Sequence, residues 1–268
     1  MAELVFVKLG GSVITDKRRP QTPRPEVIQR AAEEIAEALK VRADLRLVLG
    51  HGSGSFGHVE AARHRVRDGG GPDWFGYAAT SAAAARLNRL VTDALLQAGL
   101  PVVSLQPSAS ARCSDGVLES MDSEVVEILL ERGAIPLLYG DVGLDAVRGC
   151  TIVSTEQIFA LLARHLRPQR IIMVGEVEGV YSRDPHRCAD ARLISEVRAD
   201  NYAEIAGMLS ASHGVDVTGG MLDKVRILAC LVNAVPGLTV QLISGLKQGL
   251  IARALRGEAA GEGTLIRV

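Results

Sequence analysis

Residues 45–58 have the sequence LRLVLGHGSGSFGH, in which an apolar run leads directly into a glycine-rich loop. The run at 45–49 is typical of a strand that is buried on both faces. The three glycines of the loop allow the backbone to approach a ligand closely, and backbone N–H groups at such a loop and the following helix start form an anion site. We expect the side chain of His58, which closes the loop, to face the same cavity. The stretch therefore predicts a strand, loop and helix that together bind phosphate.

The same alternation of apolar runs and helical stretches continues along the chain. Continuous apolar runs predict buried strands, and amphipathic stretches between them predict helices. The strands are expected at 4–9, 45–49, 102–105, 135–139, 170–174 and 238–243, and the helices at 27–39, 82–97, 124–132, 158–166 and 225–232. This pattern predicts an α/β fold, a three-layer αβα sandwich with a mainly parallel central sheet. In open sheets of this kind, ligands bind outside the carboxyl ends of the strands, where this chain places its glycines.

Length and composition place limits on the class of protein. The chain has 268 residues, 47% of them hydrophobic but only 3% aromatic, so the core must be aliphatic. The net charge of −1 argues against nucleic acid or an anionic membrane surface as a partner. No apolar run approaches the roughly 20 residues of a membrane-spanning helix. Four widely spaced cysteines are typical of reduced thiols, and we expect a cytoplasmic protein.

We expect a single domain over residues 1–268, with a soft boundary between two lobes near residues 145–151. The stretch 63–74, which contains three consecutive glycines and a proline, interrupts the pattern. We interpret it as a mobile loop or a small hairpin beside the site.

Two lysine-containing motifs strengthen the phosphate interpretation. Lys8 ends the first apolar run and is followed by Gly10 and Gly11, so that a positive charge and backbone donors can meet one anion. A surface lysine beside a tight turn is the alternative. Lys17 lies in a short basic run, for which a solvated surface is the default interpretation.

A third glycine cluster, Gly219 and Gly220, precedes a helical run with Lys224 in its first turns. A lysine there opposes the helix dipole, so a bound anion explains it better than helix stability does. An ordinary capped helix remains the alternative.

Other nucleotide and metal motifs are absent or incomplete. The spacing of Gly52, Gly54 and Gly57 formally matches the dinucleotide fingerprint, but no compact βαβ unit with an acidic residue at the next strand end follows. There is no Walker-type glycine loop and no Cys/His cluster that predicts zinc.

The order of these motifs along the chain resembles that of the amino acid kinase superfamily over nearly its whole length. The motifs are Lys8-Leu-Gly-Gly-Ser12, the glycine loop that ends at His58, Tyr139-Gly-Asp141, residues 179–185 (GVYSRDP) and the cluster that ends at Lys224. Within that superfamily, the stretch 10–17 and the terminal histidine resemble isopentenyl phosphate kinases. Fosfomycin kinases share the histidine and are the nearest alternative. A non-catalytic nucleotide or metabolite sensor on the same fold is a second alternative.

This resemblance implies an ATP-dependent kinase of isoprenoid biosynthesis that phosphorylates isopentenyl phosphate to the diphosphate. It further implies Mg²⁺ that arrives with ATP, no metal site made by the protein alone, and a homodimer. Residues from 1 to about 145 would form the acceptor lobe, and those from about 146 to 268 the nucleotide lobe. The acceptor phosphate needs no general base, since its second pKa of about 6 leaves it largely dianionic at neutral pH. Catalysis would therefore consist of positioning and charge neutralisation.

The resemblance also assigns roles to individual residues. The expected catalytic residues are Lys8, Lys17, His58 and Glu156. The expected acceptor site consists of Gly10, Gly11, Gly52, Ser53, Gly54, Gly57, Phe75, Tyr77 and Asp141. The expected ATP site consists of Lys8, Ser12, Lys17, Gly175, Gly179, Tyr181, Asp184, Pro185, Gly219, Gly220 and Lys224.

One departure from the superfamily pattern falls in the expected nucleotide site. The superfamily usually has Ser-Gly-Asp-Asp before the helix expected at 158–166, whereas this chain has Ser154-Thr-Glu-Gln157. Glu156 takes the place of an aspartate that organises the lysines, which keeps a carboxylate there on a longer side chain. We expect Glu156 to reach Lys8 or Lys224.

Overall fold

The computed structural model describes residues 2–66, 73–185, 187–211 and 220–268. Its centre is an eight-stranded sheet in which every neighbouring pair is parallel except β13 and β14. The strands in spatial order are β12 (Glu196–Val197), β14 (Thr264–Ile266), β13 (Thr239–Ser244), β9 (Arg170–Gly175), β1 (Leu4–Leu9), β2 (Arg46–His51), β6 (Ile135–Tyr139) and β3 (Val102–Ser104).

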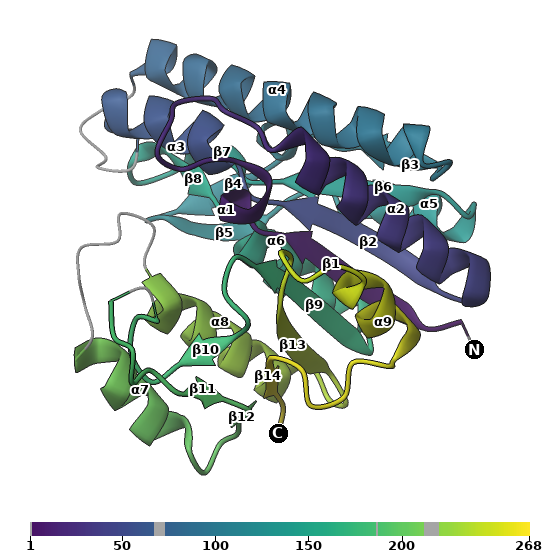
Figure 1. Ribbon diagram of the computed structural model, residues 1–268. Helices are drawn as coiled ribbons and strands as arrows, with labels where there is room; N and C mark the ends of the chain where they lie inside the picture. Colours follow the sequence, from purple (N-terminus) through teal and green to yellow (C-terminus); the bar gives the residue numbers. More distant parts are fainter. Residues whose placement is uncertain (1, 67–72, 186, 212–219) are drawn as a thin grey trace.

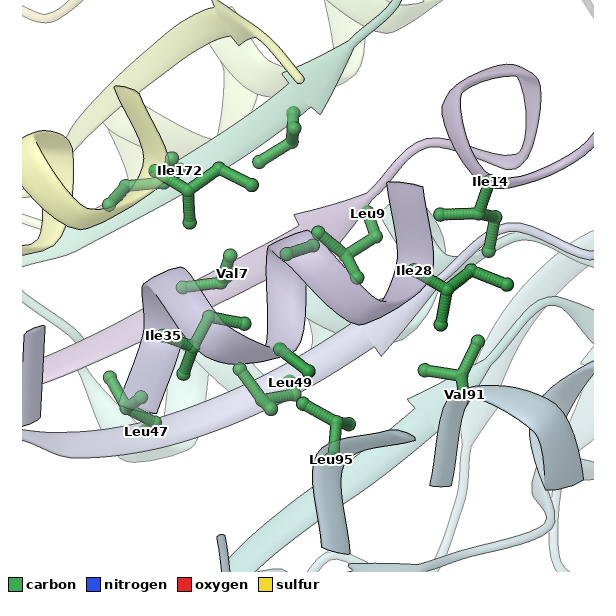
Figure 2. Close-up of a cluster of buried hydrophobic side chains, with 14 of the residues drawn as sticks. Val7, Leu9, Ile14, Ile28, Ile35, Leu47, Leu49, Val91, Leu95 and Ile172 are labelled. Carbon is green, nitrogen blue, oxygen red and sulfur yellow. The ribbon is translucent and has the colours of Figure 1, made fainter. Parts of the chain in front are cut away.

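Helices cover both faces of this sheet (Figure 1). One face packs against α2 (Pro25–Val41), α4 (Trp74–Gln97) and α9 (Leu250–Arg256). The other face packs against α5 (Glu124–Glu131), α6 (Thr155–Leu166) and α8 (Gly220–Ala234), with α7 (Tyr202–Ala211) beside α8. The alternation of β1 divides its side chains between the two cores: Val5 and Val7 lie in the first, Leu4 and Phe6 in the second. Figure 2 shows the first core, in which aliphatic side chains of α2 and α4 meet those of β1 and β2.

A second, four-stranded sheet lies beside the carboxyl ends of the main strands (Figure 1). Its order is β5 (Val117–Ser120), β4 (Arg112–Ser114), β7 (Asp141–Asp145) and β8 (Gly149–Val153). The carboxylate of Asp145 joins two of its turns, because it accepts hydrogen bonds from the backbone N–H groups of residues 115, 116, 147 and 148. Short connecting elements complete the chain: α1 (Gly11–Ile14), α3 (Gly54–Arg63), the 3₁₀ helix η1 (Pro107–Ala109), β10 (Val180–Tyr181) and β11 (Leu193–Ile194).

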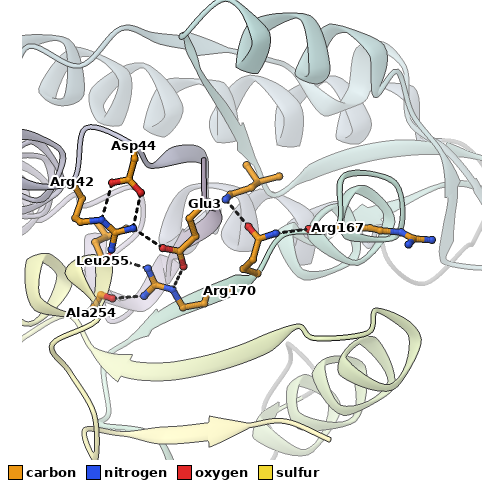
Figure 3. A network of polar contacts seen from close by, with 9 residues as sticks. Glu3, Arg42, Asp44, Arg167, Arg170, Ala254 and Leu255 are labelled. Carbon is orange, nitrogen blue, oxygen red and sulfur yellow. Dashed lines mark hydrogen bonds and ion pairs between the residues drawn. The ribbon is translucent and has the colours of Figure 1, made fainter. Parts of the chain in front are cut away.

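A polar network ties the amino end of the sheet together (Figure 3). The carboxylate of Glu3 accepts hydrogen bonds from Arg42 at 3.0 Å and from Arg170 at 2.5 Å. Arg170 also donates to the last carbonyl oxygens of α9, those of Ala254 and Leu255. The network therefore joins the end of α2, the starts of β1 and β9, and the end of α9.

The expected fold class is confirmed: the chain forms a three-layer sandwich around a mainly parallel sheet. The strands expected at 4–9 and 135–139 have these bounds. Every expected helix is present: four begin earlier than expected, and the helix expected at 124–132 ends one residue earlier, at Glu131. The expected lobe boundary falls at the turn between β7 and β8, and these two strands pair with each other. The division into two lobes stays a prediction. The stretch 63–74 lies partly outside the described residues. In the part of the chain that the structure describes, no helix is long and apolar enough to span a membrane.

Candidate active site

Five parallel strands end in glycines at one edge of the central sheet. Gly10, Gly52, Gly140, Gly175 and Gly245 each follow or end one of β1, β2, β6, β9 and β13. The registers of these strands bring the glycines to the same end. This is the edge at which an open parallel sheet binds its ligands.

The loops after β1 and β2 touch through their backbones. A Cβ atom on Gly11 would lie 2.6 Å from the backbone nitrogen of Gly54, and one on Gly52 would lie 2.9 Å from the nitrogen of Gly11. Gly54 also has φ +52°, a conformation that favours glycine. Only glycine allows the two loops to approach this closely.

The two loops leave several backbone N–H groups available to a ligand. Among the residues that the structure describes, none accepts a hydrogen bond from the N–H of Gly11, Ser12, Ser53 or Gly54. The four groups lie at the starts of α1 and α3, where the helix dipoles add positive potential. The loops therefore form an anion site.

A buried ion pair lies beside these loops. The Nζ atom of Lys8 lies 2.5 Å from Oε1 of Glu156, and each residue is only 7% exposed. Glu156 lies in the first turn of α6, whose N-cap Ser154 accepts a hydrogen bond from the N–H of Gln157. The hydroxyl of Thr155 donates to the carbonyl oxygen of His51 at 2.7 Å, which fastens the start of α6 to the end of β2. This contact orients α6 so that Glu156 meets Lys8.

The charges of two further lysines act on this pair. Burial lowers the pKa of Lys8, and the charges of Lys224 and Lys17 lower it further, whereas Glu156 opposes this shift. Burial alone would raise the pKa of Glu156, but Lys8 and Lys224 together lower it to about 2. Glu156 is therefore the counter-charge of a cluster of lysines, as the sequence predicts.

The other expected catalytic residues, Lys17 and His58, and Lys224 of the expected ATP site are more exposed than the Lys8–Glu156 pair. Lys17 is exposed in the turn after α1, and Lys224 is half-buried in the second turn of α8. His58 lies on α3 with an exposed side chain. Gly57 packs on Ser53, because a Cβ on Gly57 would lie 2.5 Å from the Oγ of Ser53.

The expected acceptor residues divide into a buried and an exposed group. Asp141, the first residue of β7, is 2% exposed, and its Oδ2 accepts a hydrogen bond from the backbone N–H of Ser108 at 3.1 Å. Burial raises the pKa of Asp141, and burial together with Asp141 raises that of Tyr77. Tyr77 packs in a small apolar cluster with Val142. Phe75 is 74% exposed and contacts the ring of His64, with ring centroids 5.6 Å apart, so it is not part of a buried acceptor site in this structure.

The expected nucleotide residues lie around β9 and β10. Gly175 ends β9, and Tyr181 in β10 donates a hydrogen bond to Glu178 at 2.8 Å. A Cβ on Gly179 would lie 2.4 Å from Oγ1 of Thr264, so packing against β14 already explains this glycine. Asp184 forms an ion pair with Arg187. Pro185 is exposed, Gly220 begins α8, and Gly219 lies outside the described residues.

Sequence reasoning assigned no role to His51, although it belongs to the deciding stretch. It is fully buried, and its ring stacks on that of Tyr139 with centroids 5.6 Å apart. A histidine at the end of an apolar strand is the one signal that could have drawn attention to it.

Comparisons with known proteins identify the family of the chain. Residues 3–237 match the model of the amino acid kinase family. An isopentenyl phosphate kinase of Methanothermobacter thermautotrophicus is 36% identical over 264 residues, which cover 95% of this chain and 96% of that protein. One of Haloferax volcanii is 40% identical over 230 residues, 85% of this chain and 88% of that protein. The chain therefore belongs to the amino acid kinase family, among the isopentenyl phosphate kinases.

Solved structures give the same result. An X-ray structure of an isopentenyl phosphate kinase superposes with a TM-score of 0.82 at 33% identity, covering 98% of this chain and 100% of that one. A substrate complex of an isopentenyl phosphate kinase superposes with a TM-score of 0.78 at 27% identity, with the same coverage.

Proposed function

We propose that this chain transfers the γ-phosphoryl group of ATP to isopentenyl phosphate and forms isopentenyl diphosphate. The observation that carries the proposal is the buried Lys8–Glu156 pair beside four available backbone N–H groups. A kinase that joins two polyanions needs fixed donors and positive charge rather than a base. Full-length relatives with this activity support the choice of acceptor.

In the proposed mechanism, Lys8 lies between donor and acceptor and stabilises the charge that develops on the transferred group. Lys17 and Lys224 bind the ATP phosphates. The loop N–H groups and His58 hold the acceptor phosphate. Glu156 keeps the lysines close together, because without a counter-charge they would repel one another.

A magnesium ion is part of the proposal, since kinases use it to neutralise the phosphates of ATP. Among the described residues, no three His, Cys, Asp or Glu side chains lie close enough to form a metal site. The residues present fit an ion that is held mainly by phosphate oxygens and water.

We further propose that the enzyme is a cytoplasmic homodimer. The support for a dimer is three exposed apolar side chains on α4 and the edge strand β3: Leu90 and Leu96 in α4 are 42% and 49% exposed, and Val103 in β3 is 38% exposed. Sedimentation equilibrium tests this part, and a monomer at micromolar concentration would contradict it.

A substrate panel at fixed Mg-ATP tests the activity. The panel contains isopentenyl phosphate, dimethylallyl phosphate, longer prenyl phosphates, fosfomycin and acetylglutamate. We expect kcat/KM for isopentenyl phosphate to exceed that for fosfomycin and acetylglutamate by several orders of magnitude. Faster turnover of fosfomycin would overturn the assignment, and no turnover of any acceptor would favour a sensor.

A further inference from the structure

His51 uses every polar group it has within the protein. Its carbonyl oxygen accepts hydrogen bonds from the N–H of Gly140 at 2.9 Å and from the hydroxyl of Thr155. In its ring, Nδ1 lies 3.0 Å from the carbonyl oxygen of Gly52, and Nε2 lies 3.3 Å from the amide oxygen Oδ1 of Asn88. Since the ring is fully buried, it does not act as an acid or base toward a ligand.

These contacts determine where the ring carries its proton. Burial lowers the pKa of His51, so the imidazole is neutral and has one N–H group. The carbonyl oxygen of Gly52 can only accept, which requires the proton on Nδ1. Nε2 then needs a donor. The structure places Oδ1 of Asn88 toward Nε2 and Nδ2 toward the hydroxyl of Ser104, and rotating the amide exchanges these two atoms and brings the NH₂ group to the ring. The other end of that amide contacts the hydroxyl of Ser104, which can donate or accept.

The hydrogen bond from the ring fixes the orientation of one peptide group in the anion loop. The carbonyl of Gly52 points toward His51, and in a planar trans peptide the N–H of Ser53 must point the opposite way. This N–H is one of the four available to a ligand. Glycine at position 52 allows the peptide to rotate easily, and a rotated peptide would present its oxygen to the anion.

We infer that His51 is a positioning residue, held in the Nδ1–H tautomer by Asn88, that keeps the N–H of Ser53 directed at the acceptor phosphate. The inference rests on the proposed function for the identity of the acceptor. It concerns a residue that never touches the substrate.

Two substitutions separate this role from simple packing. The amide nitrogen of Asn takes roughly the place of Nδ1, whereas that of Gln takes the place of Nε2. We expect His51→Asn to keep a KM for isopentenyl phosphate within about 5-fold of wild type, and His51→Gln to raise it about 10- to 100-fold, the scale of one lost hydrogen bond to a charged group. The KM for Mg-ATP should stay nearly constant in both. Equal effects of Asn and Gln, or an equal rise in both KM values, would overturn the inference.

Binding measurements separate failure of this inference from failure of the proposed function. Turnover of isopentenyl phosphate by the wild-type enzyme tests the function alone. Calorimetry with inorganic phosphate, without ATP, tests the loop in the folded wild-type and variant proteins without any turnover. Weaker phosphate binding by His51→Gln than by His51→Asn supports the inference whichever acceptor is used, and equal binding contradicts it.

The tautomer is tested by ring ¹⁵N chemical shifts, with the exposed His165 as an internal reference. Wild-type His51 should show a protonated Nδ1 and an unprotonated Nε2. Asn88→Asp offers Nε2 only acceptors, so we expect a proton on Nε2 in this variant, and a higher KM for the acceptor at pH values where Nδ1 is left unprotonated. A wild-type Nε2–H tautomer would contradict the inference.

Discussion

The two ends of the central sheet both carry paired charges, but in opposite environments. At the amino end, Glu3 is partly exposed and pairs with Arg42 and Arg170, and Arg42 also pairs with Asp44, so that two carboxylates balance two arginines. At the carboxyl end, Lys8 and Glu156 are almost fully buried, and two further lysines act on them. The first arrangement is self-sufficient, whereas the second has an excess of positive charge that a polyanion would balance. Charge pairs therefore stabilise the fold at one end and prepare a binding site at the other.

The largest effect is expected from Glu156→Gln, which keeps the shape of the side chain and removes its charge. We expect kcat to fall on the order of 10³-fold, because the lysines lose their counter-charge. The melting temperature should change little, since Lys8 has a lowered pKa and can lose its proton instead of remaining buried and charged. Glu156→Asp should be partly active.

Steady-state kinetics and thermal denaturation check this prediction, with Glu127→Gln on the exposed side of α5 as a matched control. Wild-type kinetics in Glu156→Gln would remove Glu156 from the site.

His58→Ala should have the next largest effect, a loss of about 10²- to 10³-fold in kcat/KM, the scale of one transition-state donor. His58→Gln can still donate a hydrogen bond and should retain more activity than Ala. The measurement is the pH profile of kcat/KM for the acceptor. Two results together would contradict the donor role. The Gln and Ala variants would be equally inactive, and the wild-type rate would depend on deprotonation of a histidine at pH values where the acceptor is already dianionic.

The opposite outcome is expected at the amino end. Glu3→Gln leaves Arg42 and Arg170 without their shared carboxylate and should lower the free energy of unfolding by about 1–2 kcal/mol, allowing for solvent screening. The kcat should be unchanged, since the residue lies at the far end of the sheet from the glycine loops (Figures 1 and 3). Urea denaturation gives the first quantity. If Glu3→Gln had wild-type stability but an impaired kcat, the charge pairs at the amino end would serve catalysis and not the stability of the fold.

The smallest effect is a change in pH dependence. Glu156 raises the pKa of Lys8, so Glu156→Gln should lower that pKa further, and more of the lysine should be neutral at high pH. When the pH is lowered from about 8.5 to about 6.5, Lys8 of the variant becomes protonated again. The ratio of variant activity to wild-type activity should therefore rise a few-fold. A constant ratio over this range would mean that the protonation of Lys8 is not what the substitution changes.

The sequence predicted the elements that have a strong periodic signal. The strands at 4–9 and 135–139 are continuous apolar runs, and their bounds were correct. The start of α4 was expected at residue 82 but lies at Trp74, because its first two turns mix aromatic residues, glycine and alanine without a clear apolar stripe, and the cap is the side chain of Asp73. The four-stranded sheet was missed, because its strands of three to five residues are held by a long-range contact, the carboxylate of Asp145.

The candidate site was predictable to a similar extent. The expected contact of Glu156 with a lysine is present. It could be predicted because Glu156 takes the motif position of a carboxylate that balances the charge of the lysines. The exposure of Phe75 and the packing role of Gly179 could not be predicted, since both depend on neighbours distant in sequence. The hydrogen bonds of His51 depend on Asn88 and Gly52 together and follow no sequence spacing.

The position of β1 has a consequence for the synthesis of the chain. β1 is synthesised before the other strands of the sheet, yet it lies between β2 and β9, and Lys8 and Glu156 are 148 residues apart. A nascent chain that ends before residue 170 can pair β1 with β2 but leaves its other edge open. The Lys8–Glu156 pair of the active site therefore forms only after residue 156 has been made, and until β9 follows, β1 presents an unpaired edge that must be kept from aggregating.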